Sequence, residues 1–450
     1  MPRRIRSLGL FGKTARTAAK PNAQTQYALD KYTALLPLVN GQDKGDSATP
    51  PLEGDPATLL RRLGPPLPFV LGGSPRLSVT RLMTKGWCEL RYLYDARAGI
   101  PRPAAAARTL TRGTRAHARL ENSAHPGDAR LAAALRAEGM GDFVRTLPYG
   151  WAATLGRLLQ LAAGGESREL LCHGWVRGSS DAPPVLVSGV VDRLSWEGEA
   201  PIPLPLDDST DIATLLPLLQ EQVNERVKHG GNIVVSDTKT RSTFTTPTQG
   251  SVLRATTMQL AYYRGYLEAL AQDAPRTFAS LLENARLHGV DADAPLRTEE
   301  VAALVRLVPS LQADAAQLAA GEAVQTLVGP VTVASPCWLA ARLAQGYALL
   351  GGALGGTLRV EYYCRGTNFH TATVPYSAAL RAERVAHEAD AAAFLWGRRP
   401  VQPVARRLDA LRTYCAHCDY AAVCGWKRAV ERDLGGLGPA LVRIAEGACV

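Results

Sequence analysis

One short stretch, residues 232–241 (NIVVSDTKTR), constrains the fold of this chain more than any other. Four residues of strand character lead into Asp237, and Lys239 lies two positions further on. Side chains at i and i+2 of a strand point to the same face, so a carboxylate and an ammonium are predicted to lie side by side at the end of a strand. An isolated pair of this kind is usually an ordinary exposed ion pair. The surrounding motifs therefore decide its meaning.

A second strand-like stretch, residues 185–194 (VLVSGVVDRL), carries Asp192. Two acids near one lysine can hold a hard divalent cation against a phosphate. His117, on a predicted helix upstream, is available as a third ligand, and an imidazole ligand favours tolerance of Mn²⁺ beside Mg²⁺. Lys239 would orient the attacking water or offset the charge that develops on the phosphate. His117 by itself would be read as an ordinary surface residue.

Several other polar residues stand close to these motifs. Glu121 shares a helix face with His117 at i+4, where a solvated position fits better than a ligand. Gln259 and Tyr263 are likewise i,i+4 on a predicted helix. The glutamine is suited to a phosphate or a ligand-shell water and the tyrosine to stacking on a base, although the tyrosine also fits a core position. Arg241 either is solvated or follows a nucleic-acid backbone.

The order of the predicted elements gives the fold class. Helices are expected from Ser78 or Thr80 through Tyr94, around His117, and over residues 128–161, 212–227, 256–270 and much of 276–350; strands are expected over residues 169–176, 185–196, 232–239, 357–364 and 370–374. Helices that flank these strands indicate a mixed α/β core. Residues 197–230 are an insertion between two of the strands.

Composition limits the class of protein. The 450 residues are 46% hydrophobic and 20% charged, as in a globular protein of two or three domain-sized units. A net charge of +10 suits a polyanionic partner. No run of 18 apolar residues is present, so no membrane span is expected. Gly12-Lys13-Thr14 lacks the upstream glycine and strand of a phosphate-binding loop, and it is rejected as one.

The N-terminal segment has a composition of its own. Residues 1–29 hold six lysines and arginines and no acid, with serine and alanine between them and no apolar core. This composition favours a mitochondrial transit peptide, with a nuclear address or a disordered basic tail as alternatives. A Pro/Gly-rich linker follows, so the predicted organisation is a tail and linker over residues 1–75, a main domain over 76–435 and a C-terminal tail over 436–450.

Eight cysteines are present, and three of them are closely spaced. Cys415, Cys418 and Cys424 form a C-x2-C-x5-C pattern that is typical of metal or cluster ligation. The fourth ligand would be His417 or a remote cysteine, of which Cys88 is the best placed. The spacing does not separate zinc from an iron–sulfur cluster, and zinc would be the default. A site that joins Cys88 to the tail would staple the whole domain.

These motifs, taken in order, resemble a known family. The chain is similar over roughly residues 76–430 to the exonuclease V family, the iron–sulfur members of the RecB-like PD-(D/E)xK nuclease superfamily. The similarity is carried by SVTRLMTKGWCELRYLY, RGTRAHARLE, HGWVRG, SGVVDRL, SDTKTR, QLAYYRGYL and the cysteine-rich tail that ends in CGWKR.

The resemblance implies a restriction-endonuclease-like core and a set of functional residues. It implies that a [4Fe–4S] cluster replaces the zinc default and that Mg²⁺ is the catalytic ion. The implied cluster ligands are Cys88, Cys415, Cys418 and Cys424. The implied Mg²⁺ ligands are His117, Asp192, Asp237 and the carbonyl of Thr238. It further implies that Lys239 is the catalytic lysine and that Gln259 and Tyr263 belong to a Q-x-x-x-Y motif.

The resulting hypothesis is a monomeric, Mg²⁺-dependent exonuclease that degrades single-stranded DNA from its ends. The resemblance implies a preference for the 5′ end and a role in mitochondrial DNA maintenance or repair, with a single-strand-binding protein as a conceivable partner. One alternative is a zinc- or cluster-stapled single-strand DNA-binding protein without catalysis, and another is a nuclease subunit that works with a helicase.

Overall fold

The computed structural model describes most of the chain from residue 76 onward. The described residues are 76–84, 88–91, 104–176, 184–198, 210–248, 250–395, 399, 401–404, 411, 414–418, 420–421 and 424–436. The predicted transit peptide, the linker and the C-terminal tail beyond residue 436 lie outside them, as does most of the two loops expected after residues 176 and 198.

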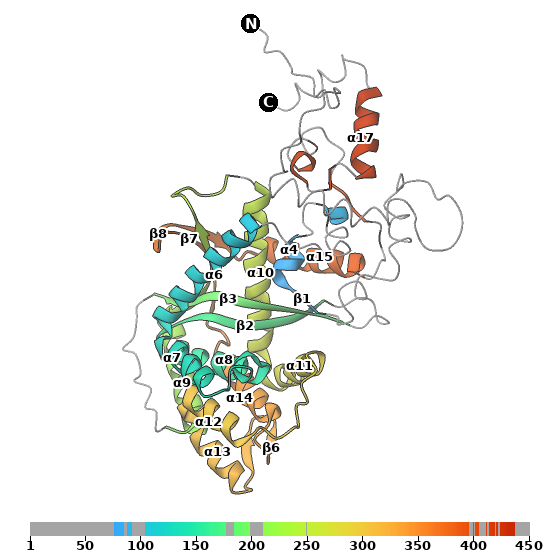
Figure 1. The fold of residues 1–450 in the computed structure, drawn as a ribbon. Helices are drawn as coiled ribbons and strands as arrows, with labels where there is room; N and C mark the ends of the chain where they lie inside the picture. The colour runs from blue at the N-terminus through green and yellow to red at the C-terminus, as the bar shows by residue number, and fades with distance from the viewer. Residues whose placement is uncertain are drawn as a thin grey trace, which may run out of the picture.

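A six-stranded mixed sheet forms the centre of the molecule (Figure 1). Its strands are β1 (Arg76–Ser78), β2 (Glu166–Val176), β3 (Val185–Glu197), β4 (Asn232–Arg241), β7 (Leu354–Cys364) and β8 (Thr367–Pro375). β7 pairs parallel with β4, and β8 pairs antiparallel with β7. The predicted mixed α/β class is confirmed.

The two edges of β3 are occupied differently. β2 pairs antiparallel with one edge from Val185 to Ser195. The other edge is shared, because β1 pairs parallel with residues 186–188 and β4 pairs antiparallel with residues 193–197. Between these two partners, residues 189–192 face no other strand of the described sheet on that edge. The sheet therefore has a local gap, bounded by β1 and β4.

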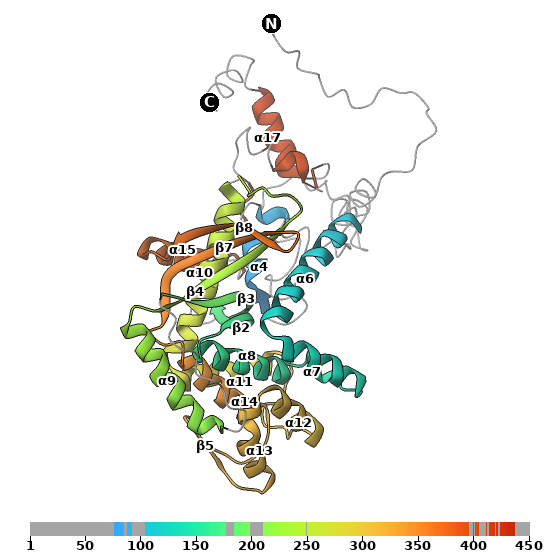
Figure 2. The ribbon, with the colours of Figure 1, turned by 90° about the vertical axis from the view of Figure 1, so that its left-hand side faces the viewer.

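Helices cover the sheet and build a second layer beneath it (Figure 2). They are α4 (Val79–Thr84), α6 (Ala104–Ala124), α7 (Pro126–Ala137), α8 (Leu147–Ala162), α9 (Ile212–Lys228), α10 (Gly250–Gln272), α11 (Ala274–Leu287), α12 (Thr298–Leu307), α13 (Gln312–Ala319), α14 (Pro336–Ala348), α15 (Ala378–Leu395) and α17 (Gly425–Gly436). The short elements are the 3-10 turns η1 (Phe143–Arg145), η2 (Pro309–Leu311) and η3 (Cys415–His417), and the hairpin of β5 (Val324–Thr326) and β6 (Gly329–Val331). The long helix α10 contacts β2, β3, β4 and β7, while α6 contacts β2 and β4.

Two sequence predictions of helices were wrong in part. The helix expected from Ser78 onward is preceded by strand β1, and α4 ends at Thr84, before the cysteine-containing segment. The helix expected over residues 128–161 is two helices, because Gly139 takes a left-handed φ of +83° just after α7 and ends it. The remaining predicted strands lie where they were expected, and α9 and α10 extend slightly beyond their predicted bounds.

The helical layer is fixed by a buried ion pair. Both carboxylate oxygens of Asp314 accept hydrogen bonds from Arg342, at 2.7 and 2.8 Å, and the indole of Trp338 donates a third at 2.9 Å. From α14, the Tyr347 hydroxyl donates to the carbonyl of Leu171 in β2 at 2.6 Å. These bonds attach the helical layer to the sheet. None of the described helices is both long enough and apolar enough to cross a bilayer.

Candidate active site

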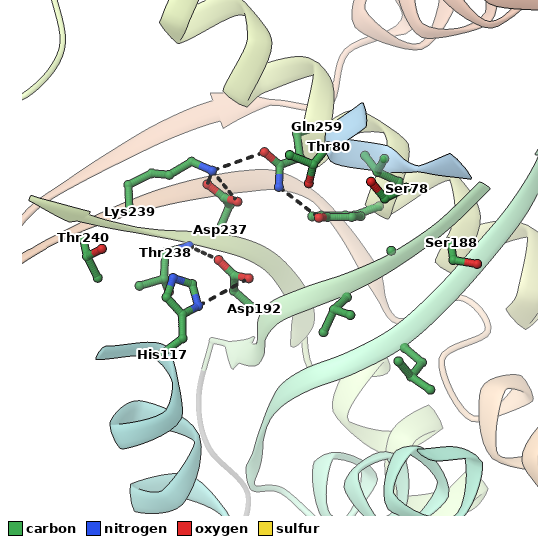
Figure 3. Close-up of a pocket in the computed structure, with 15 residues that line it drawn as sticks. Ser78, Thr80, His117, Ser188, Asp192, Asp237, Thr238, Lys239, Thr240 and Gln259 are labelled. Carbon is green, nitrogen blue, oxygen red and sulfur yellow. Dashed lines mark hydrogen bonds and ion pairs between the residues drawn. The ribbon is translucent and has the colours of Figure 1, made fainter. Parts of the chain in front are cut away.

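A cavity of about 580 Å³ opens at the gap in the sheet (Figure 3). Its walls come from β1, α4, α6, β3, β4 and α10, so segments far apart in the sequence meet there. The predicted site residues that line it are His117, Asp192, Asp237, Thr238, Lys239, Gln259 and Tyr263. The gap exists because β1 and β4 take separate ends of the same edge of β3.

The two predicted acids lie next to each other where β3 and β4 separate. Their antiparallel pairing stops at Arg193 and Ser236, one pair short of Asp192 and Asp237. Oxygen Oδ2 of Asp192 instead accepts a hydrogen bond from the backbone amide of Thr238 at 2.6 Å. Where the strands separate, a hydrogen bond from backbone to side chain thus takes the place of a backbone–backbone pair. Both carboxylates line the cavity.

Lys239 is held by two side chains, Asp237 and Gln259, on the α10 side of β4. Its Nζ lies 3.0 and 2.9 Å from the two carboxylate oxygens of Asp237, which is fully buried. The same Nζ donates to Oε1 of Gln259 at 3.2 Å, and Nε2 of Gln259 donates to the Tyr263 hydroxyl at 2.9 Å (Figure 3). Gln259 and Tyr263 thus orient the lysine.

Tyr263 packs closely against β3. Its side chain is only 4% exposed, and its ring lies where a Cβ on Gly189 would approach it to 2.6 Å. Gly189, three residues before Asp192, is therefore required for the close approach of α10 to β3. The glycine in the SGVVDRL motif has this steric role.

His117 reaches the site from α6 and contacts an acid that the sequence analysis missed. Its Nδ1 lies 3.3 Å from Oε1 of Glu169 and 3.8 Å from Oδ1 of Asp192. One ligand atom from each of these three side chains lies within 4.8 Å of the others. The only sequence signal for Glu169 was a charged residue at the start of the apolar run that follows it in the strand.

Two predicted residues lie outside the wall of the cavity. Glu121 accepts a hydrogen bond from Arg157 of α8 at 2.6 Å, so it anchors α6 and thereby supports His117 indirectly. Arg241 donates to the carbonyl of Thr245 at 3.3 Å and orders the loop after β4.

The cavity concentrates negative charge. Burial, followed by the nearby charge of Asp237, raises the pKa of Asp192 to about 7. The hydrogen bond to Glu169, and then the charge of Asp192, raise the pKa of His117. Carboxylates whose ionisation is disfavoured in this way are stabilised by a bound cation.

Comparison with known proteins agrees with this arrangement. A family model described as "Exonuclease V - a 5' deoxyribonuclease" matches residues 69–427 of the 450. The chain belongs to the exonuclease V family. It is therefore a hydrolase, a 5′ deoxyribonuclease that acts on DNA, and a nuclease of this family implies a metal ion.

Similar exonuclease V proteins come from yeasts. The chain is 33% identical to "Exonuclease V, mitochondrial" of Eremothecium gossypii, over 83% of this chain and 80% of the relative. It is 31% identical to the protein of the same name from Candida glabrata, over 82% and 83% of the two chains. The Kluyveromyces lactis protein, also named mitochondrial, is 26% identical. These names agree with the mitochondrial prediction.

The four predicted cluster cysteines of this exonuclease V chain meet at one place. Cys88, Cys415, Cys418 and Cys424 line a single small pocket. Burial, and then the neighbouring thiols, raise the pKa of Cys415 to about 12. Among the described residues, no three cysteine sulfurs lie within 4.8 Å of one another.

A polar contact joins the two segments that carry these cysteines. The Glu89 carboxylate, next to Cys88, accepts hydrogen bonds from Arg399 at 2.8 Å and from the amide of Gln402 at 2.6 Å. Glu89 is buried, so the contact is shielded from water. It joins segments more than 300 residues apart independently of any metal.

Proposed function

We propose that this exonuclease V chain is a Mg²⁺-dependent, single-strand-specific exonuclease that degrades DNA from the 5′ end in mitochondrial DNA maintenance or repair. The observation that carries the proposal is the ion pair of buried Asp237 with the partly exposed Lys239, beside Asp192 in one open cavity. Family membership removes the non-catalytic alternative.

The side chains of the cavity fit a hard divalent cation. Asp237 is fully buried, and its Oδ2 receives no well-directed hydrogen bond within the described part of the chain. Asp192 has one oxygen bound to an amide and the other directed toward His117. Asp192, Asp237, the Thr238 carbonyl and His117 would hold Mg²⁺ or Mn²⁺. When bound, the ion would polarise the scissile phosphate and acidify an attacking water.

Lys239 has a defined part in the reaction. The Asp237 carboxylate and the Gln259 amide orient its ammonium, and the side chain is still 33% exposed and lines the cavity. An ammonium placed there donates a hydrogen bond to the attacking water or to a non-bridging phosphate oxygen. Water oxygen bonds to phosphorus as one backbone P–O bond breaks, and the lysine offsets the charge that develops on the phosphoryl oxygens.

Three aromatic side chains near Lys239, here called the aromatic line, support a single-stranded substrate; they are Tyr362, Phe369 and Phe244. Tyr362 of β7 pairs in register with Lys239. Its ring lies 6.3 Å from Phe369, which in turn contacts Phe244 edge-on at 5.5 Å. Phe244, in the loop after β4, is 57% exposed. Exposed aromatic rings beside a cationic site bind unpaired bases by stacking, whereas paired bases present no free face.

The proposed cofactor at the four cysteines is a [4Fe–4S] cluster that staples a restriction-endonuclease-like domain over residues 76–435. Its support is that Cys88, Cys415, Cys418 and Cys424 line one small pocket, as a single set of ligands would. Anaerobically purified protein should be brown, and Cys418→Ser should bleach it and lower its unfolding temperature. A colourless protein with stoichiometric zinc would refute the cluster.

The proposed location is the mitochondrion, with residues 1–75 as a basic leader and linker. The names of the yeast relatives support this location. A fusion of residues 1–40 to a fluorescent protein should enter mitochondria, and nuclear accumulation would contradict the proposal. The enzyme is proposed to act as a monomer on single-stranded DNA, with a single-strand-binding protein as a partner.

The central test is a cleavage assay. The full chain is incubated with single-stranded, duplex and 5′-blocked DNA, each labelled at one end, with and without Mg²⁺. We expect short products from single-stranded DNA alone, no cleavage without Mg²⁺, and protection by the 5′ block. Equal cleavage of duplex DNA would contradict the strand specificity. Unchanged cleavage of the 5′-blocked strand would contradict the polarity.

A further inference from the structure

Glu169 of β2 has a backbone conformation that most residues avoid. Among the described residues, it and Arg365 are the non-glycines with positive φ, at +52° and +54°. Left-handed backbone is unfavourable for a residue with a Cβ. Arg365 belongs to the tight turn between β7 and β8, where this conformation is expected. Glu169 lies inside a strand, where no turn requires it.

This conformation interrupts one pair of the β2–β3 ladder. Arg168 pairs with Arg193 and Leu170 with Val191, but the pair between them, Glu169 with Asp192, is absent from the ladder. The register is the same on both sides, so the strands resume without a shift. The interruption therefore affects only the two acidic residues.

A buried arginine, Arg157, holds the backbone of Glu169 in place. Its carbonyl accepts a hydrogen bond from Nη1 of Arg157 at 2.7 Å. Arg157 is buried and also binds Glu121 of α6 at 2.6 Å and Asp128 of α7 at 3.2 Å. The same guanidinium thus fixes both the strained strand and the helix that carries His117. A strained residue supported in this way commonly serves a functional site.

The side chain of Glu169 meets His117 and Asp192. Its Oε1 lies 3.3 Å from Nδ1 of His117, and Oδ1 of Asp192 lies 3.8 Å from the same nitrogen. The other oxygen of Asp192 is already bound to the Thr238 amide. One possible ligand atom from each of the three side chains lies within 4.8 Å of the others, a separation that one cation can bridge.

We propose that Glu169 is a ligand of the divalent cation, together with His117 and Asp192. The inference rests on the metal-dependent nuclease function proposed above and adds an acid from the first long strand of the sheet. Two carboxylates and an imidazole favour Mg²⁺ or Mn²⁺. Glu169 brings a second carboxylate to the His117 side of the cavity.

The test is Mn²⁺ affinity, measured by titration calorimetry on the full chain without DNA. Glu169→Gln keeps the size of the side chain and removes its charge, and we expect it to weaken Mn²⁺ binding roughly tenfold or more. The same change in a His117→Ala background separates two roles. If Glu169 is a ligand, Glu169→Gln still lowers the Mn²⁺ affinity in that background. If Glu169 only orients His117, the change has no further effect there. Loss of the effect in that background, or unchanged affinity in the single variant, overturns the proposal.

A second readout uses the backbone. Glu169→Gly relieves the left-handed strain, so it should raise the unfolding temperature while it lowers Mn²⁺ affinity. Arg365→Gly is the matched control, because it relieves the same φ in a turn and should leave Mn²⁺ affinity unchanged. Weakened Mn²⁺ binding in Arg365→Gly as well would overturn the assignment. A wild-type chain that neither binds Mn²⁺ nor cleaves DNA would instead refute the proposed function itself.

Discussion

Two buried aspartates in this protein, Asp314 and Asp237, have opposite surroundings. Asp314, in the helical layer, is 5% exposed and has both oxygens bound by Arg342 and Trp338. Asp237, in the sheet, is fully buried, yet its only charged partner in the described contacts is the partly exposed Lys239. It also faces a second acid, Asp192, whose pKa is raised to about 7.

The comparison shows how one residue type is used in two ways. A buried carboxylate with all its oxygens bound holds elements together, and loss of a partner leaves an uncompensated charge. A carboxylate pair with binding capacity left over is costly in the folded chain and becomes favourable when a cation binds. The helical layer therefore stabilises the protein, while the gap in the sheet has the properties of the proposed active site.

The largest expected effect is on catalysis. Asp237→Asn removes the charge that orients Lys239 and that would bind the metal in the proposed mechanism, so we expect the rate of cleavage to fall roughly 10³-fold or more, about 4 kcal/mol of transition-state stabilisation. Release of label from the 5′ end of single-stranded DNA measures the rate, and a binding assay on the same DNA should show little change. A rate within tenfold of wild type would contradict the role of Asp237.

The corresponding change at Asp314 is expected to affect stability alone. Asp314→Asn leaves the buried guanidinium of Arg342 without its counter-charge, and we expect the free energy of unfolding to fall by about 3–5 kcal/mol. Denaturant titration gives this value. The cleavage rate per folded molecule should be unchanged.

An exposed ion pair provides the control for Asp314→Asn. Glu138 binds Arg306 at 2.8 Å on the surface. Glu138→Gln should leave the denaturation midpoint near that of wild type, because solvent screens such pairs. An equal loss in both variants would show that burial is not the deciding factor.

The contact between the sheet and the helical layer should be sensitive to acid. His173 of β2 is buried, and burial lowers its pKa from 6.5 to about 4. Its Nε2 contacts the hydroxyl of Ser280 at 2.8 Å, and that hydroxyl accepts from the Trp175 indole at 2.8 Å, so the imidazole nitrogen accepts the hydroxyl proton. The fold therefore favours the neutral ring.

The sign of this pH effect follows from the lowered pKa. The unfolded chain takes up a proton as the pH falls through 6.5, while the folded chain resists until about pH 4. The contribution of neutral His173 to the free energy of unfolding is fully present above pH 6.5. It is lost as the pH falls from 6.5 toward 4, by up to about 3 kcal/mol. His173→Gln should flatten the free energy of unfolding between pH 6.5 and 4. An unchanged slope would show that other groups dominate.

The smallest expected effect is on substrate binding. Phe244→Ala should weaken binding of single-stranded DNA roughly tenfold, since stacking on one base contributes about 1–3 kcal/mol. Leu327→Ala is the matched control, because Leu327 is also 57% exposed but lies on the β5–β6 hairpin. Fluorescence anisotropy with a short labelled oligonucleotide would measure both. Equal affinity of Phe244→Ala and wild type would remove the aromatic line from the substrate path.

Errors of the sequence analysis occurred where distant contacts override local preference. Residues 76–78 form a strand because β3 offers them an edge more than one hundred residues away. Glu169 was missed because its left-handed backbone depends on Arg157 of α8.

The sequence by itself determined the mixed α/β class, the places of most strands and helices, and the residues Asp192, Asp237 and Lys239 of the site. These follow from periodicity and short motifs, which are local properties of the chain. Only the tertiary structure decided that β1 and β4 divide one edge of β3, that a cavity opens between them, and that Glu169 faces His117. Such features depend on the packing free energy of the whole core, and no local pattern encodes that quantity.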